Sequence, residues 1–250
     1  MNKTTLLACV AVTTLAIATA TPAAEGPTPP RKEQVTFAKG ASAATIKGTL
    51  KGDATVDYVV RAAAGQTLEV KLEGSNAQND FNILPPGSND VAMFASSSSG
   101  ARKYSGVLPT DGDYAVRVYL MRPAARRNEA TKYALTIAVT GKPLPPLSAT
   151  RDAKVAGTAY HATAQVNCVP PYETAAMMCD AGVIRRGNDG TATVVAIGKN
   201  NLVRRILFVQ GKPMAADGMD AVSSSKQGDL TTVKVGEERY DIPDAFLTGG

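Results

Sequence analysis

The chain has 250 residues, a formal net charge of +5, a single histidine and no tryptophan. Its length allows one large or two small domains, and the mild excess of positive charge favours acidic partners or anionic surfaces. Aromatic residues make up only 5% of the chain, which argues against a protein that binds single-stranded nucleic acid or long sugars mainly by stacking. With no nucleic-acid recognition motif in the sequence, we expect no nucleic-acid partner.

The N-terminal residues predict export. Lys3 supplies a positive charge, an uncharged apolar run extends from Leu6 to Ile17, and small residues then allow cleavage after Ala20 or Ala24. We therefore expect a signal peptide over residues 1–24 and a periplasmic location. The apolar run is too short to span a bilayer and no later segment is longer, so no membrane span is expected.

Residues 25–33 are rich in proline and polar residues and predict a disordered lead-in. Residues 34–141 then predict an antiparallel β-sandwich, with a closed barrel as the alternative, because short segments with period-two apolar spacing alternate with turn residues. The expected strands cover residues 35–37, 45–50, 57–62, 67–72, 80–84, 91–95, 104–108, 113–120 and 132–139, and the serine run at 96–99 is expected to be a flexible loop.

The proline-rich stretch at 142–149 predicts a stiff linker, because proline cannot donate a hydrogen bond within a sheet. Residues 150–250 predict a second, smaller antiparallel β domain, with strands at 191–197, 202–209, 230–235 and 239–243 and one helical turn near 173–179. The predicted class of the whole chain is therefore all-β.

Cysteine usage agrees with export. Cys9 lies within the expected signal peptide, too early for a lipoprotein signal, which leaves Cys168 and Cys179. In an oxidising compartment an even pair most simply forms a disulfide.

The sequence offers little sign of an enzyme. It contains no nucleophile elbow, zinc-binding helix motif or phosphate-binding glycine loop, and His161 stands alone. The pairs Asp111/Asp113 and Asp241/Asp244 are typical of turn chemistry. We expect no enzymatic activity, no metal site and no cofactor; an exported hydrolase, with its site between the domains, rests only on these scattered residues.

One segment combines several arginines with a stiffening proline. Arg117 falls in an expected strand, and Arg122, Arg126 and Arg127 fall in the loop that follows, which Pro123 stiffens. Guanidinium groups bind carboxylates bidentately, so this loop suits an acidic cleft. The alternative is a solvated basic hairpin tip. The pairs at 185–186 and 204–205 are interpreted as ordinary solvent-facing charge.

Residues 34–140 resemble the periplasmic inhibitors of g-type (goose-type) lysozyme. The resemblance rests on five segments in order, V-T-F-A-K-G-A-S-A-A (35–44), I-K-G-T-L-K-G (46–52), D-Y-V-V-R-A-A-A-G-Q (57–66), Y-S-G-V-L-P-T-D-G-D-Y-A-V-R-V-Y (104–119) and R-P-A-A-R-R-N-E-A-T-K-Y (122–133). It implies a small β-sandwich that inserts loops into the active-site cleft of a g-type lysozyme and so protects peptidoglycan. The residues that it implies for this contact are Arg122 and Arg126 inside the cleft, with Arg127, Asn128, Tyr104, Ser105 and Asp53 beside them.

Two features depart from that family. Members carry an aromatic residue just after the position of Lys51-Gly52, where this chain has Asp53. An acidic residue repels an acidic cleft, so either the loop is displaced or inhibition is weaker. The second domain resembles no family that we can name. The alternative function is therefore a glycan-binding or adhesion module of the envelope without inhibitory activity, with peptidoglycan as a partner; the sequence predicts no oligomeric state.

Overall fold

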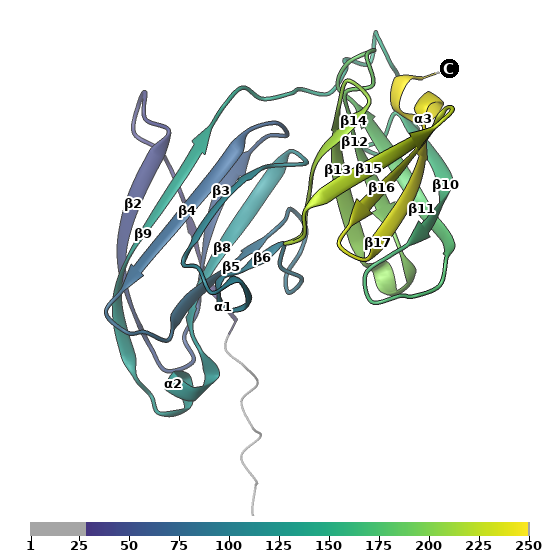
Figure 1. Cartoon of the computed structure of the whole chain (residues 1–250). Helices are drawn as coiled ribbons and strands as arrows, with labels where there is room; N and C mark the ends of the chain where they lie inside the picture. The colour runs from purple at the N-terminus through teal and green to yellow at the C-terminus, as the bar shows by residue number, and fades with distance from the viewer. Residues whose placement is uncertain (1–28, 250) are drawn as a thin grey trace, which may run out of the picture.

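A computed structural model of the chain describes residues 29–249 and is built mainly from β-strands, which confirms the all-β class (Figure 1). The expected signal peptide lies outside the described residues. Residues 31–140 form two stacked sheets, called here the N-terminal sandwich, and residues 162–248 form a strongly curved sheet with a terminal helix, called the C-terminal barrel.

The sandwich contains a five-stranded and a four-stranded sheet. In spatial order the first sheet is β1 (Arg31–Gln34), β3 (Val56–Ala62), β8 (Gly112–Leu120), β5 (Asn79–Leu84) and β6 (Phe94–Ala95). The second is β2 (Ala43–Lys51), β9 (Ala130–Thr140), β4 (Thr67–Gly74) and β7 (Lys103–Val107). Their strands pair antiparallel, except that β1 runs parallel to β3.

The sandwich core comes from the alternation seen in the sequence. Along β8, Tyr114, Val116 and Val118 face inward and are fully buried, while the residues between them face outward. The hydroxyls of Tyr58 and Tyr133 lie 2.7 Å apart in the core and join the two sheets by a hydrogen bond. Alternate burial of this kind is what period-two patterning produces in a sheet with one face against a core.

Three expectations in the sandwich are corrected. The lead-in expected to be disordered through residue 33 enters strand β1 at Arg31, while residues 35–37 lie outside any strand. The serine run expected to be a flexible loop forms the helical turn α1 (Ser96–Ser99). Ser96 is buried, accepts a hydrogen bond from the Phe81 N–H at 2.9 Å and donates one to Asp80 at 2.8 Å, and these bonds fix the turn.

The barrel is a single eight-stranded antiparallel sheet whose edge strands β14 and β15 approach each other, so that it nearly closes. In spatial order its strands are β14 (Lys212–Ala216), β13 (Val203–Val209), β12 (Ala192–Ile197), β11 (Met177–Arg185), β10 (Ala162–Val169), β17 (Glu238–Pro243), β16 (Leu230–Val235) and β15 (Val222–Gln227). The 3-10 turn η1 (Lys199–Asn201) and helix α3 (Asp244–Thr248) complete it.

The expected disulfide is confirmed. Cys168 on β10 and Cys179 on β11 are bonded, fully buried and 5.9 Å apart between Cα atoms. The helical turn expected near residues 173–179 is wrong, because Met177–Cys179 belong to β11 and pair with β10 from Val166 to Cys168.

Sandwich and barrel meet in a junction of buried polar contacts. Arg186 of the barrel lies 2.8 Å from Asp111 of the sandwich and donates to the Leu144 carbonyl at 2.5 Å. Thr193 donates to the Pro109 carbonyl at 2.6 Å, and Ala64 packs against an apolar cluster of the barrel. Burial lowers the pKa of Arg186 from its ordinary value, against the opposing effect of Asp111.

The two arginine pairs interpreted as solvent-facing charge are in fact largely buried. Arg185 bonds to Asp152 at 2.9 Å and Arg186 to Asp111, while Arg205 bonds to Asp217 at 2.8 Å. Arg204 forms ion pairs with Asp217 and Glu238. Each buried guanidinium has a carboxylate partner, as the energetic cost of burying a lone charge requires.

Candidate functional site

The loop that carries the predicted arginines is a single helical turn, α2 (Arg122–Arg126), rather than an irregular loop. Pro123 stands in the first turn of this helix, where its missing N–H has no partner to lose. Ala124 and Ala125 follow and favour helix. The Ala124 side chain is fully buried, so the turn is fastened to the end of the sandwich. We call residues 121–129 the arginine turn.

Asn128 ends the helix and ties it to a second turn. Its φ of 54° lies in the left-handed region that asparagine tolerates, and its N–H donates to the Ala125 carbonyl at 2.9 Å. The Gly52 N–H donates to the Glu129 carbonyl at 2.9 Å, and a Cβ on Gly52 would lie only 2.8 Å from Asn128 Oδ1. The turn that carries Asp53 is therefore fixed against the arginine turn.

Arg122 and Arg126 are four residues apart on this helix, so they project from the same face. Both are exposed, and within residues 29–249 neither guanidinium has an ion pair or a hydrogen bond. Like charges at this spacing destabilise a helix by about 0.2–0.5 kcal/mol. The pair thus contributes nothing to folding and is free to bind an external carboxylate.

Arg127 is placed differently, because Glu129 holds it. The Glu129 carboxylate accepts hydrogen bonds from Asn76 at 2.7 Å and from Arg127 at 2.6 Å. These two hydrogen bonds lower the pKa of Glu129, and the bond from Asn76 has the larger effect. The charge of Arg127 is therefore largely balanced within the protein.

Tyr104 and Ser105 are not brought to the arginine turn. Tyr104 on β7 pairs with Val70, which pairs with Ile137, seven residues beyond the first residue of β9. At about 3.4 Å per residue, roughly 24 Å of strand separates this position from the turn. The Tyr104 ring packs on Phe94 with 5.0 Å between centroids, and burial raises its pKa to about 12. Ser105 is exposed on the opposite face of the strand.

The structure adds residues that the sequence did not single out. Exposed Lys51 pairs with Ala130 and exposed Lys132 pairs with Thr49, which places both beside the arginine turn. Asn76 also holds the arginine turn in place, through its hydrogen bond to the Glu129 carboxylate. The two lysines could have been placed beside the turn only from the register between β2 and β9. That register joins segments far apart in the sequence and leaves no local pattern.

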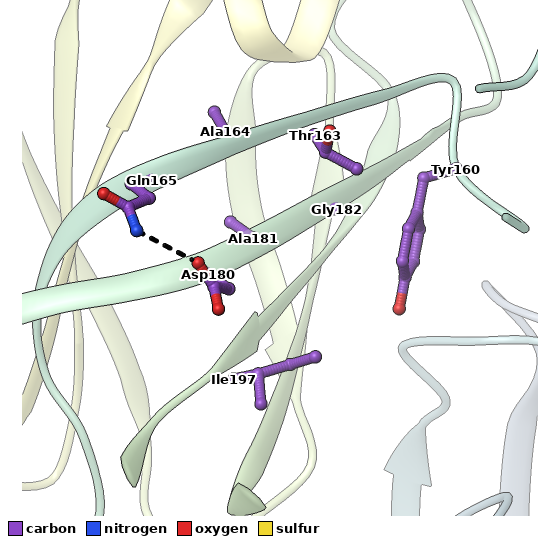
Figure 2. A pocket seen from close by; sticks show the side chains of 8 residues that line it. All are labelled: Tyr160, Thr163, Ala164, Gln165, Asp180, Ala181, Gly182 and Ile197. Atoms are coloured by element: carbon purple, nitrogen blue, oxygen red, sulfur yellow. Dashed lines mark hydrogen bonds between the residues drawn. The ribbon is translucent and has the colours of Figure 1, made fainter. Parts of the chain in front are cut away.

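A separate hollow lies on the outer face of the barrel, over β10 and β11 (Figure 2). The Tyr160 ring lies over Gly182, where no Cβ could fit, and Gln165 donates to Asp180 at 3.2 Å. None of the predicted contact residues lines this hollow. Nearby His161 is buried and accepts the Arg185 N–H on Nδ1 at 2.9 Å, which is a structural role.

Two further properties concern only the described part of the chain. Residues 29–249 contain no group of three or more histidine, cysteine or acidic side chains placed to hold a metal ion. Among the same residues, no helix has the length and apolar character needed to cross a membrane.

The chain was compared with known proteins. No family model matches it. The inhibitor of g-type lysozyme of Escherichia coli (strain K12) is 33% identical over 132 residues, which cover 52% of this chain and 93% of that protein. The length of the match fits the sandwich and not the whole chain.

Two solved structures of periplasmic inhibitors of g-type lysozyme are also similar. That from Aeromonas hydrophila is 34% identical, over 45% of this chain and 98% of its own, with a TM-score of 0.42. That from Salmonella Typhimurium is 32% identical, over 44% of this chain and 98% of its own, with a TM-score of 0.35.

Proposed function

Because this chain belongs to the family of inhibitors of g-type lysozyme, we propose that it binds a g-type lysozyme in the periplasm and blocks the active-site cleft with the arginine turn. The relative is named as an inhibitor of an enzyme, which agrees with the expectation that this chain has no enzymatic activity of its own. The observation that carries the proposal is the exposed, unpaired Arg122–Arg126 pair on one face of a fixed helical turn.

The chemistry of the target supports this role for the arginines. A lysozyme cleft holds ionisable carboxyl groups, one of which stays protonated as the general acid. A guanidinium placed beside such a group favours its ionised form and occupies the space of the sugar substrate. Two guanidiniums on one face can each donate a bidentate pair of hydrogen bonds to a carboxylate.

The rigidity of the turn also supports tight binding. Ala124 is buried, Asn128 closes the helix and Glu129 is bonded to Gly52, so little backbone freedom remains to be lost on association. A contact loop that is ordered before binding avoids the entropic cost of ordering it in the complex.

Asp53 opposes the same contact. It is exposed, forms no ion pair within residues 29–249, and lies next to Gly52, which is hydrogen-bonded to the arginine turn. Because the loop is held in place, we propose that Asp53 approaches the acidic cleft together with the arginines and weakens binding by charge repulsion.

The test is lysis of a peptidoglycan suspension by g-type lysozyme, with c-type (hen-type) lysozyme in parallel to report class selectivity. The mature protein is titrated against Arg122→Ala/Arg126→Ala. Truncating one partner of a buried charge pair costs about 2–5 kcal/mol, so we expect the inhibition constant to rise at least about 30-fold. Asp53→Asn should lower it, by up to about tenfold if about 1.4 kcal/mol of repulsion is removed.

The matched control is Lys142→Ala/Arg151→Ala, which removes two exposed cations from the connection between sandwich and barrel, outside the arginine turn. It should inhibit like the wild type. Equal losses in the control and in the arginine variant would indicate non-specific charge attraction. Inhibition unchanged in Arg122→Ala/Arg126→Ala would place the contact elsewhere, and wild-type protein that inhibits neither enzyme would refute the proposed function.

A further inference from the structure

A groove follows the junction of sandwich and barrel. It consists of two adjoining hollows of about 210 and 600 Å³, which share Val91, Leu202 and Val203 in their walls. The loop at 85–92 supplies the sandwich side, and the barrel side comes from the turns around Tyr172, Met219 and Glu237. The groove exists only because the barrel is attached to the sandwich.

Large apolar side chains are exposed along this groove. Val91, Tyr172 and Met219 are 49%, 94% and 50% exposed and all line the larger hollow. Within residues 29–249 six large apolar side chains are exposed, so half of them gather at one place. Clustered exposed apolar side chains beside polar groups mark interaction sites.

The backbone at Tyr172 is strained, and its side chain is exposed to solvent. Tyr172 has a φ of 66° and follows Pro170 and Pro171, and the Glu173 N–H closes the turn on the Pro170 carbonyl at 3.2 Å. This position of a tight turn normally carries glycine or asparagine. A bulky residue held there without packing is an outlier of the type that clusters at functional sites.

The free charge of the groove is negative. Its two arginines are balanced, Arg204 by Glu238 and Asp217, and Arg205 by Asp217. Asp90, Asp220 and Glu237 line the groove, are exposed and have no ion pair within the described residues. Asp220 lies against Gly236, where a Cβ would come within 2.8 Å of its carboxylate. The chain as a whole has a formal net charge of +5, so the negative charge of the groove is a local feature.

We propose that this groove binds an extended segment of a partner protein in which lysine or arginine stands beside a large apolar side chain. The unpaired carboxylates attract the cation, and the face of the Tyr172 ring offers it a second attraction. Val91 and Met219 receive the apolar side chain. The same negative charge disfavours nucleic acid and anionic lipid or glycan surfaces. This binding is separate from lysozyme inhibition and does not depend on it.

The test uses the ¹⁵N-labelled mature protein and two capped peptides of equal length, K-F-K-L-K and E-F-E-L-E. In two-dimensional NMR, the basic peptide should cause saturable shifts in the amides of residues 90–92, 172–173, 218–220 and 236–237, weaker at high salt. The acidic peptide should cause none. Absence of localised shifts with millimolar basic peptide, or equal shifts with both peptides, would overturn the proposal.

Variants separate the groove from general charge effects. Tyr172→Gly suits the backbone of the turn, so the protein stays folded, and it should raise the dissociation constant of the basic peptide at least tenfold. Asp220→Asn/Glu237→Gln should weaken binding and reduce its salt dependence. The control Met214→Ser removes an equally exposed methionine outside the groove and should bind like the wild type. Wild-type affinity in Tyr172→Gly would refute the site.

Discussion

Replacing Asp111 with asparagine isolates the charge of the ion pair that joins sandwich and barrel. The Arg186 side chain is 0% exposed and that of Asp111 is 31% exposed. Asparagine keeps an oxygen for the Ala64 N–H, which Asp111 Oδ1 accepts at 3.0 Å, but leaves Arg186 without a counter-charge. Such one-sided removal costs about 3–5 kcal/mol, and water that reaches Asp111 offsets part of it. We therefore expect a loss of about 3 kcal/mol in the free energy of unfolding, or about 6–12 °C in Tm for a chain of this size.

The measurement is urea unfolding of the wild type, Asp111→Asn, Arg186→Met and the double variant. Because replacing a whole buried pair by uncharged groups is often close to neutral, the double variant should lose less stability than the two single losses added together. The coupling free energy should exceed about 1 kcal/mol. Additive losses, or a loss below about 1 kcal/mol in Asp111→Asn, would show that the pair does not hold the junction and that its other contacts do.

The remaining predictions concern the disulfide, the arginine turn and acid stability. Replacing Cys168 and Cys179 with serine should lower the free energy of unfolding by about 3 kcal/mol, since the bond closes a loop with a sequence separation of 11; wild-type urea unfolding that is insensitive to reductant would contradict this. Asn128→Ala, at a φ of 54°, should lose about 1 kcal/mol and weaken inhibition, whereas Asn128→Gly should retain both, as urea unfolding and the lysis assay would report. Burial acts to raise the pKa of Asp241, but hydrogen bonds from Asn167, Thr232 and Arg239 outweigh it and hold the pKa below 3.8. The carboxylate thus stabilises the fold above 3.8 and loses this effect as pH falls through its lower folded pKa. The stability deficit of Asp241→Asn should be constant above about pH 5 and shrink at lower pH, and a deficit that does not change with pH would contradict the assignment.

Much of the sandwich could be predicted because its strands have one apolar and one solvated face. The segments at 113–120 and 132–139 alternate in the sequence and in burial, and the segment at 57–62 does so except at Asp57, which is buried. Strands without alternation were missed. β15 is V-S-S-S-K-Q with no buried residue, and β1 is R-K-E-Q. β1 forms by pairing with β3, which lies farther along the chain, and β15 by pairing with the strongly patterned β16. Neither pairing leaves a pattern within the strand itself.

The role of the arginine turn stays a prediction, and its helical form was not predicted from the sequence. A proline followed by two alanines is a good helix start, and the sequence interpretation of this segment as a stiffened loop missed it. The contact that fixes the turn joins Gly52 to Glu129 and depends on the register between β2 and β9. The arginine pairs of the barrel were misjudged for the same reason, because their carboxylate partners, such as Asp111 and Glu238, lie far away in the sequence.

The arginine turn and the junction lie at opposite ends of the sandwich, and β9 runs between them (Figure 1). Its 11 residues, at about 3.4 Å each, set a spacing of about 35 Å. A protein bound at the arginine turn therefore leaves the junction uncovered. The arginine turn and the junction can be occupied at the same time. The chain can then act as a spacer, and a second attachment would raise the local concentration of the arginine turn wherever the first is held.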